Sequence, residues 1–241
     1  MPVYRIADLN IEIHAHYPFV LRQCAAYLAP AGARADFSVE VPEEEILASH
    51  REKPNFSLGY HESISFYRHL CRALLPYDAF LMHAAVVAYD GRAYAFSAHS
   101  GTGKSTHISL WRQVYGDAVT IINGDKPILR RTPEGGFIAY GTPWCGKEGW
   151  NRNTSAPLAA ICFLERSTEN RIRPMASGEA VDHIFGQLLR PKDAMEMNRT
   201  ISLADALLCT VPMYLLGCNI SREAAELSFT TLTRAPRKEN L

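Results

Sequence analysis

The chain has 241 residues, and its 25 Lys and Arg side chains balance 25 Asp and Glu side chains, so its formal net charge is zero. That balance excludes a protein coated in basic residues for binding nucleic acid or anionic lipid. With 47% hydrophobic and 21% charged residues, the composition is that of an ordinary globular protein of one or two domains. The longest apolar runs fall short of the ~18 residues of a membrane span, and residues 1–10 lack the pattern of a signal peptide. We therefore expect a cytoplasmic protein without nucleic-acid or membrane partners.

Six cysteines are scattered along the chain without Cys-x-x-Cys spacing: Cys24, Cys71, Cys145, Cys162, Cys209 and Cys218. In a cytosolic chain of this length, such cysteines are more often buried thiols than a disulfide or zinc framework.

The N-terminal part, residues 1–79, predicts a small α/β region packed on the core. Its expected elements are a strand over Val3–Ile13, a helix over Pro18–Ala29, a strand over Asp36–Val41 and a helix over Gly59–Leu75. The polar segment Ala48–Ser57 is the expected boundary within this part. Residues 80–241 form the expected main domain, unless 1–241 is one continuous domain.

Two apolar runs, Phe80–Tyr89 and Arg92–Ala98, flank Asp90-Gly91. Asp-Gly between apolar runs is a strong signal for a two-residue hairpin, because both positions must adopt positive φ. A glycine-rich loop and a helix over Lys104–Tyr115 follow.

The rest of the chain alternates between strand and helix patterns. Strands are expected at Ala118–Ile122, Ile128–Arg130, Phe137–Tyr140, Leu158–Leu164 and Met213–Cys218, and helices at Gly178–Leu189, Asn198–Val211 and Ser221–Thr233. The basic end, Arg234–Leu241, is expected to fray. The alternation predicts an α/β fold with a mixed central β-sheet.

The glycine-rich loop has the composition of a phosphate-binding loop. Its sequence is Ser100-Gly-Thr-Gly-Lys-Ser-Thr106, between an expected strand and an expected helix. Gly101 and Gly103 would let backbone N–H groups turn inward, Lys104 could reach the β- and γ-phosphates, and the Ser105 hydroxyl could bind Mg²⁺. Ala98 replaces the first glycine of the pattern GxxxxGK[ST]. The alternative is a structural turn that binds no nucleotide.

A carboxylate follows the next expected strand, in the sequence Asn123-Gly-Asp-Lys-Pro127. If that strand adjoins the strand before the glycine-rich loop, Asp125 is placed to hold Mg²⁺ or to take a proton from a hydroxyl. Asn, Gly, Asp and Pro are also turn formers, so a simple turn is an equal alternative.

Several segments in one order resemble the catalytic domain of HPr kinase/phosphorylase and the related ATP-dependent phosphoenolpyruvate carboxykinases. They are Met82-His-Ala-Ala-Val86, the Asp90-Gly91 hairpin, Ser100–Thr106 and Gly124-Asp-Lys126. This resemblance covers about residues 80–165. Gly141-Thr-Pro-Trp-Cys-Gly-Lys147, Pro157–Glu165 and Gly59-Tyr-His-Glu62 are similar to uncharacterised bacterial HPr-kinase-like proteins, over nearly the whole chain.

The resemblance implies a phosphoenolpyruvate carboxykinase-like nucleotide-binding core and ATP-dependent phosphoryl transfer. The implied nucleotide-binding residues are Ser100, Gly101, Thr102, Gly103, Lys104, Ser105 and Thr106, and the implied magnesium ligands are Ser105 and Asp125. Asp125 matches the second residue of the family's Asp-Asp pair and could also act as the base. Gly124 stands in the place of the first Asp.

Two further residues are catalytic candidates. His83 lies in an apolar run and is either a satisfied core histidine or, as the resemblance implies, a neighbour of the metal or phosphate. Lys147 belongs to a Pro/Gly-rich loop that is either a lid bringing a cation to the phosphoryl group or a structured surface loop. His99 is expected to tolerate the turn, and Glu62 and Arg166 to serve in salt bridges or caps.

The leading hypothesis is a kinase that uses ATP and Mg²⁺ and phosphorylates a hydroxyl. By resemblance the acceptor is a serine in a protein, a peptide or the free amino acid, and homo-oligomers are common among the related kinases. The alternative is a non-catalytic nucleotide-binding partner protein, which Gly124 favours. Residues 97–152 hold 7 basic and 4 acidic side chains, a net charge of +3, which is consistent with one small anionic ligand there.

Overall fold

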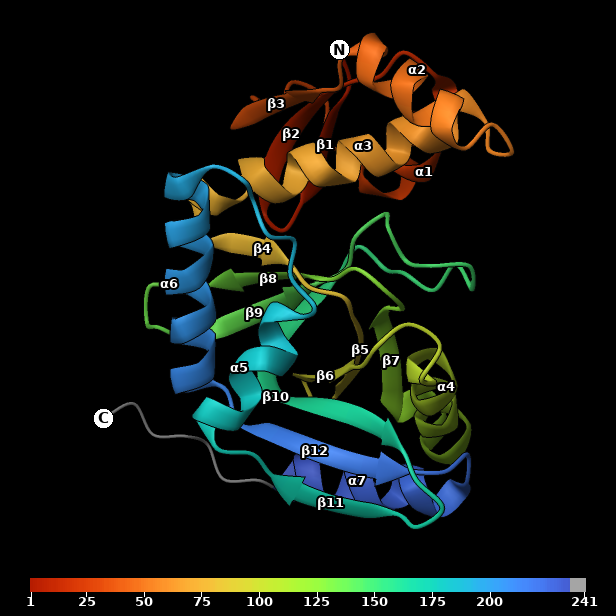
Figure 1. Cartoon of the computed structure of the whole chain (residues 1–241), viewed down its shortest axis with the longest axis vertical. Helices are drawn as coiled ribbons and strands as arrows, with labels where there is room; N and C mark the ends of the chain where they lie inside the picture. The colour runs from red at the N-terminus through yellow and green to blue at the C-terminus, as the bar shows by residue number, and fades with distance from the viewer. Residues whose placement is uncertain (235–241) are drawn as a thin grey trace.

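The computed structural model describes residues 1–234 and shows a mixed α/β fold with two sheets (Figure 1). Of the end expected to fray, Arg234–Leu241, Arg234 is the last residue of a helix, and residues 235–241 lie outside the described residues. The smaller sheet has the order β1-β2-β3 and is made of Val3–Ile6, Leu9–His14 and Phe37–Glu40. The expected single strand over Val3–Ile13 is wrong. Ala7 and Asp8 adopt positive φ (54° and 57°) and turn the chain into a β1–β2 hairpin.

The helices of the N-terminal part are α1 (Pro18–Gln23), α2 (Glu43–Glu52) and α3 (Leu58–Ala73). The helix expected over Pro18–Ala29 is shorter and continues only as a 3-10 turn over Ala25–Tyr27. The polar segment Ala48–Ser57 is not a simple linker, because its first half is the end of α2. Three glutamates open α2, where the positive end of the helix dipole favours acidic side chains.

The N-terminal elements pack directly on the larger sheet. Figure 1 shows α3 between the three-stranded sheet and β4 (Ala79–Leu81). One buried apolar cluster contains Ile11 of β2, Phe66 of α3 and Leu81 of β4, together with Trp144 from a later loop. The Trp144 ring stacks on Phe66, with centroids 5.9 Å apart. This cluster therefore joins the two sheets; a separate N-terminal unit over 1–79 stays a prediction.

The larger sheet has nine strands among the described residues. The strands after β4 are β5 (Ala84–Tyr89), β6 (Arg92–Ser97), β7 (Val119–Asn123), β8 (Ile128–Arg131), β9 (Phe137–Tyr140), β10 (Ser155–Arg166), β11 (Arg171–Pro174) and β12 (Met213–Cys218). Their order is β4-β8-β9-β10-β6-β5-β7, and β12 joins β10 and β11. The run expected over Phe80–Tyr89 is divided between β4 and β5, β10 is longer than expected, and β11 was not expected.

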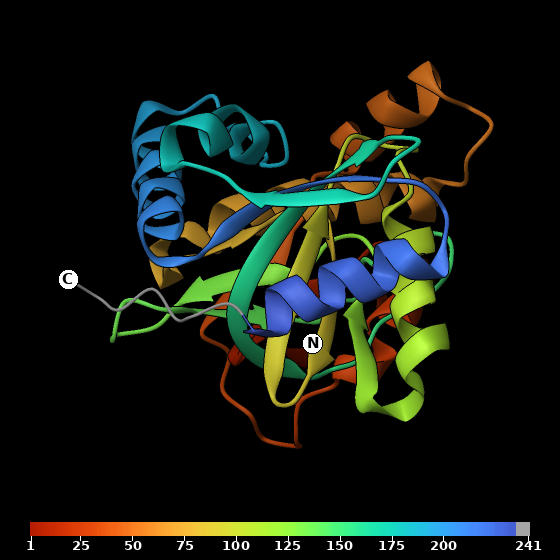
Figure 2. The same ribbon diagram turned by 90° about the horizontal axis from the view of Figure 1, so that it is seen from below.

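Strand β10 makes the sheet curl. Its first residues pair antiparallel with β9, its middle pairs parallel with β6, and its last residues pair parallel with β12. Figure 2 shows it as one long, bent strand. The register shifts between Leu158 and Ala160, and such irregularities bend a strand and increase its twist.

The hairpin of β5 and β6 sets the geometry of the functional edge. Asp90 and Gly91 have φ of 49° and 69°, which confirms the expected turn. Strand β5 lies between β6 and β7 and is antiparallel to both. The condition set for Asp125, that β7 adjoins β6, is therefore not met. Even so, the carboxyl ends of β6 and β7 and the amino end of β5 lie at the same edge of the sheet.

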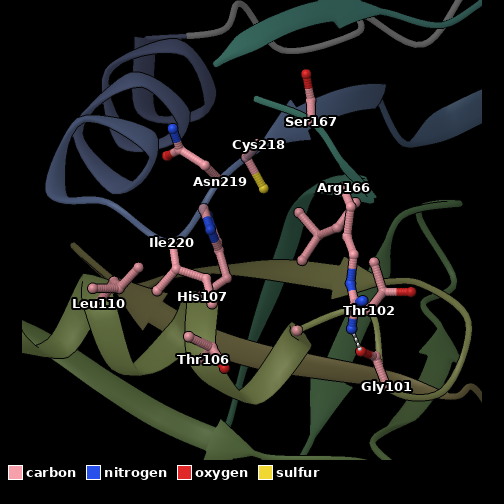
Figure 3. A pocket seen from close by; sticks show the side chains of 12 residues that line it. Gly101, Thr102, Thr106, His107, Leu110, Arg166, Ser167, Cys218, Asn219 and Ile220 are labelled. Atoms are coloured by element: carbon pink, nitrogen blue, oxygen red, sulfur yellow. Dashed lines mark hydrogen bonds between the residues drawn. The ribbon is translucent and has the colours of Figure 1, made fainter. Parts of the chain in front are cut away.

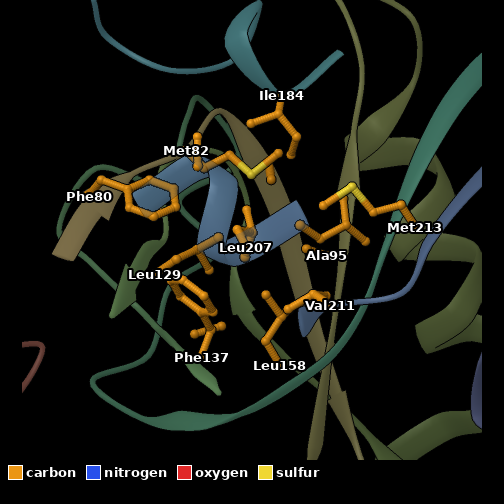
Figure 4. Packing of buried hydrophobic residues seen from close by; sticks show 14 of the residues in the cluster. Phe80, Met82, Ala95, Leu129, Phe137, Leu158, Ile184, Leu207, Val211 and Met213 are labelled. Carbon is orange, nitrogen blue, oxygen red and sulfur yellow. The ribbon is translucent and has the colours of Figure 1, made fainter. Parts of the chain in front are cut away.

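Helices cover both faces of β5 and β6. The helices are α4 (Lys104–Tyr115), α5 (Ser177–Phe185), α6 (Ala194–Thr210) and α7 (Arg222–Arg234). Ala84 and Val86 pack in the cluster that includes Ile184 of α5 and Leu207 of α6 (Figure 4). Ala85 and Val87 pack in the cluster that contains residues of α4 and α7. This alternation is the two-residue period of a strand buried on both sides.

The cysteines are all free thiols, and Cys24, Cys71 and Cys162 are buried as expected, whereas Cys209 is exposed. Among residues 1–234, none of the helices has both the length and the apolar character needed to cross a membrane.

Gly141 is predicted to be essential for the fold, because its backbone meets two other segments. A Cβ there would lie 1.9 Å from the Arg152 carbonyl oxygen and 2.8 Å from that of Ile122. We expect Gly141→Ala to lower the free energy of unfolding by about 3 kcal/mol or more. In urea denaturation, Gly178→Ala is the matched control, since a Cβ at Gly178 of α5 meets no atom within 4 Å. A Gly141→Ala variant as stable as the wild type would contradict the packing described.

Candidate functional site

A cavity of about 490 Å³ opens at the edge of the sheet where β6 and β7 end and β5 begins. It is lined by His83, Ser100, Gly101, Gly103, Lys104, Ser105, Thr106, Gly124, Asp125, Gly146, Lys147 and Glu148. Every residue expected from the sequence to act at the site is among them except Thr102, which lines a neighbouring cavity. Four chain segments, far apart in sequence, thus converge on one space.

The glycine-rich loop links β6 directly to α4. Gly101 and Gly103 have φ of 79° and 123°, values that side chains rarely allow. Helix α4 begins at Lys104, as expected, and its first backbone N–H groups are left without partners within the helix. Ala98 has no positive φ and is buried beside Phe96, so its methyl group fits where the sequence pattern has glycine. The loop therefore has the backbone geometry of an anion-binding turn.

Lys104 is the buried cation of the cavity. The residue is only 7% exposed, and its Nζ donates to the Ala98 carbonyl oxygen at 3.1 Å. Burial lowers the pKa of Lys104 to about 8; the negative charge of Asp125 opposes this shift and the positive charge of Lys126 adds to it. An anion in the cavity would favour the protonated ammonium, because opposite charges raise the pKa of a lysine.

Asp125 is positioned by an Asx turn that starts from the last residue of β7. The Oδ1 atom of Asn123 accepts hydrogen bonds from the backbone N–H groups of Asp125 (2.9 Å) and Lys126 (2.7 Å). Asn123 is itself fully buried, and its Nδ2 donates to the Thr142 carbonyl oxygen at 3.0 Å. From the sequence, the segment Asn123–Pro127 was either a simple turn or part of a functional site. The segment does form a turn, and this turn holds the Asp125 carboxylate at the cavity.

The charges around Asp125 keep it ionised. Burial raises the pKa of this carboxyl, but the hydrogen bond from His83 and the positive charges of Lys126 and Lys104 outweigh that effect and lower the pKa below its usual value. Lys126 Nζ lies 3.7 Å from Asp125 Oδ2. The carboxylate is thus available as an acceptor for a proton or a ligand for a cation.

His83 is a fixed neighbour of this carboxylate. Its Nε2 lies 3.1 Å from Asp125 Oδ1, and its Nδ1 lies 3.0 Å from Gln187 Oε1. The backbone N–H of His83 also donates to the Gln187 carbonyl oxygen at 2.9 Å. The two side-chain contacts fix the orientation of the imidazole ring. Gln187 follows α5 and was not singled out from the sequence, which has no local signal for a contact across 104 residues.

Gly124 stands where the resemblance has the first of two Asp residues, and packing explains the glycine. A Cβ there would lie 2.9 Å from the Cys145 carbonyl oxygen. A Cβ on Gly146 would lie 3.2 Å from the Cβ of Asp125. The loop that carries Lys147 and Glu148 is therefore packed against the Asp125 turn.

A second cavity, of about 480 Å³, shares Gly101, Gly103 and Thr106 with the first. Arg166 lines this second cavity, and its Nη2 donates to the carbonyl oxygen of Gly101 in the glycine-rich loop at 2.5 Å (Figure 3). The expected salt-bridge or cap role of Arg166 is thus replaced by a contact with the glycine-rich loop. Glu62, in contrast, lies in the N-terminal part, where it accepts from the backbone N–H groups of His16 and Tyr17.

Comparison with known proteins gives one family for most of the chain. The model of the family described as SynChlorMet cassette protein ScmC matches residues 64–226, a segment that includes every residue lining the two cavities. No curated protein matches the chain. Among solved structures, the HPr(Ser) kinase/phosphatase from Coxiella burnetii is similar, with a TM-score of 0.37 and 12% identity over 64% of this chain and 93% of that chain.

Lys104 is predicted to lower the stability of the free protein. Its pKa is lower in the folded chain (about 8) than in the unfolded chain, so the ammonium is penalised below pH 8 and the penalty fades as pH rises to about 10. We expect Lys104→Met to raise the free energy of unfolding at pH 7 by about 1–3 kcal/mol. Urea denaturation at pH 7 and pH 10 tests this. A variant less stable than the wild type at pH 7, or a difference that grows with pH, would contradict it.

Proposed function

The chain belongs to the ScmC family of SynChlorMet cassette proteins, and we propose that it is a kinase that transfers the γ-phosphoryl group of ATP to a hydroxyl group with the help of Mg²⁺. One juxtaposition carries the proposal: the N-terminus of α4 with its buried Lys104 and the ionised Asp125 with His83 line the same cavity. A phosphoryl donor requires the first pair of features, and a hydroxyl acceptor requires the second.

The phosphates are proposed to bind on the loop from Ser100 to Thr106. The loop amides and the positive end of α4 would receive the β-phosphate, because both present N–H groups to an anion. Lys104 would contact the β- and γ-phosphates. Lys147, which also lines the cavity, would supply a second cation that can stabilise the charge on the transferring phosphoryl group.

The residues present fit Mg²⁺. This ion binds oxygen ligands and usually takes one or two carboxylates, several waters and substrate phosphates, so it needs few protein ligands. The hydroxyl of Ser105 and a carboxylate oxygen of Asp125, which line the same cavity, are suitable donors. When bound, the ion would neutralise charge on the β- and γ-phosphates.

Asp125 is also the proposed base. Its lowered pKa makes it a carboxylate at neutral pH, and it can accept the proton of the acceptor hydroxyl as the oxygen bonds to the γ-phosphorus and ADP leaves. His83 would orient this carboxylate through the contact between its Nε2 and Asp125 Oδ1. The proposed acceptor is the hydroxyl of serine, in a protein, a peptide or the free amino acid.

The packing around Gly124 favours a second candidate function, a nucleotide-binding protein that does not catalyse transfer. A Cβ at this position would meet the Cys145 carbonyl oxygen at 2.9 Å, so the chain has no room for a second carboxylate at the place where the related kinases have one. With one carboxylate, the separate tasks of metal binding and proton transfer fall on the same residue.

Substitutions at Lys104 and Asp125 distinguish the two functions. With γ-labelled ATP, Mg²⁺ and serine or serine-containing peptides, we expect wild-type protein to transfer label to the acceptor or slowly to water. Asp125→Asn should lower the rate by about 10²–10³-fold because it removes the base and a magnesium ligand. Asp117→Asn is the matched control, since the Asp117 side chain is almost fully exposed in the 3-10 turn Gly116–Ala118 before β7, where it pairs with Arg112.

Binding is measured in parallel by the ATP-dependent rise in melting temperature. Lys104→Met should abolish most of that rise. Tight ATP binding without transfer or hydrolysis, and unchanged by Asp125→Asn, would contradict the kinase and favour the non-catalytic function. No ATP-dependent stabilisation of the wild type would contradict both.

A further inference from the structure

The second cavity beside the glycine-rich loop, which contains Arg166, has no role in the phosphoryl transfer proposed above. It lies between α4, the end of β10 and the segment after β12 (Figure 3). Its volume of about 480 Å³ is in the range of small-molecule sites. Because Gly101, Gly103 and Thr106 line both cavities, a ligand with phosphates on the loop would extend into this space.

The walls of this cavity are apolar and its edges are polar. Leu110 of α4, Leu164 of β10 and Ile220 provide the aliphatic surface, and Arg166, Ser167 and Asn219 provide polar groups. A nucleobase has this same division, with apolar ring faces and polar edges. Inorganic pyrophosphate or triphosphate has no apolar surface, so it would gain nothing from these aliphatic side chains.

The charge of the cavity also suits this ligand. None of the described residues that line it is acidic. His107 is buried, which lowers its pKa to about 4, so it contributes a neutral ring at neutral pH. Arg166 is the cation of the lining, and its planar guanidinium group can stack on an aromatic ring.

Ile220 is held at this cavity by a fixed turn. The preceding residue, Asn219, lies just after the end of β12. Its N–H donates to Asn170 Oδ1 at 3.0 Å, and its Nδ2 donates to the Thr168 carbonyl oxygen at 3.2 Å. Ile220 itself is 79% exposed. A large apolar side chain that is held in place and left in water can gain contacts when a ligand covers it.

We propose that this cavity binds the nucleoside portion of the phosphoryl donor, with the base between Leu110, Leu164 and Ile220. The inference rests on the proposed function, because it takes the triphosphate to lie on the loop from Ser100 to Thr106. It adds the residues that would recognise the nucleoside and distinguish ATP from an inorganic polyphosphate, and it assigns the base to the β10–β12 side of the loop.

Isothermal titration with ATP and with inorganic triphosphate, each with Mg²⁺, tests the assignment. We expect Ile220→Ser to weaken ATP binding by about 5- to 10-fold, the effect of losing the contacts of one aliphatic side chain. Binding of inorganic triphosphate should change by less than about 2-fold, because its contacts are to the loop. Ile201→Ser is the matched control, since Ile201 is a 45% exposed isoleucine of α6 and should leave both affinities unchanged.

Thiol labelling gives a second readout that needs no substitution. Cys218 lines the cavity, whereas Cys209 is exposed on α6. After reaction with N-ethylmaleimide and peptide mapping, ATP and ADP should slow the modification of Cys218 at least 5-fold. Inorganic triphosphate should have little effect on Cys218, and none of these ligands should protect Cys209.

The outcomes separate this inference from the proposed function. If wild-type protein binds ATP but Ile220→Ser does not alter its affinity and ATP does not protect Cys218, the nucleoside assignment is wrong and the kinase proposal stands. If inorganic triphosphate binds as tightly as ATP, the assignment is also wrong. If neither ligand binds, both proposals fall.

Discussion

The antiparallel position of β5 between β6 and β7 is the constraint on which the candidate site depends. Because β5 runs opposite to both neighbours, its first residue lies at the edge where β6 and β7 end. His83 precedes β5, the glycine-rich loop follows β6, and Asp125 follows β7. The Asp90-Gly91 turn fixes the pairing of β5 with β6, and the Asx turn at Asn123 fixes the direction in which the chain leaves β7. A sheet of this order thus brings three segments together.

The second feature of the site is its concentration of buried charge. Lys104, Lys126 and Asp125 share a small, partly buried volume. Two cations and one carboxylate leave a positive excess there, although the whole chain is neutral. Burial lowers the pKa of Lys104 to about 8, so the free protein holds this cation at some loss of stability. An anionic ligand would remove that loss. Binding sites commonly lower the stability of the free protein in this way, because they hold groups that only the ligand satisfies.

Local sequence signals predicted the local structures well. The Asp-Gly hairpin and the start of helix α4 at Lys104 follow from the identity of neighbouring residues. The shared cavity of Lys104 and Asp125 depends instead on the order of the strands, which the sequence did not predict. The reason for Gly124 could not be predicted, because it depends on the Cys145 carbonyl oxygen in a later loop. The contacts of Gln187 with His83 and of Arg166 with Gly101 join segments that are 104 and 65 residues apart. No periodicity or motif encodes such contacts, and the strand order β6-β5-β7 was missed for the same reason.

The central claim is that the buried Lys104 receives the phosphates of a nucleotide, and proton uptake on binding tests it most directly. Titration calorimetry with Mg²⁺ and ATP at pH 8.5, repeated in buffers of different ionisation enthalpy, measures the protons taken up. With a pKa of about 8 in the free protein, Lys104 is mostly neutral at this pH and should be protonated in the complex. We predict an uptake of about 0.7 proton per bound ATP in the wild type and almost none in Lys104→Met, which is titrated at ATP concentrations high enough to offset its weaker binding. ATP binding with no proton uptake, or with equal uptake in both proteins, would contradict the account.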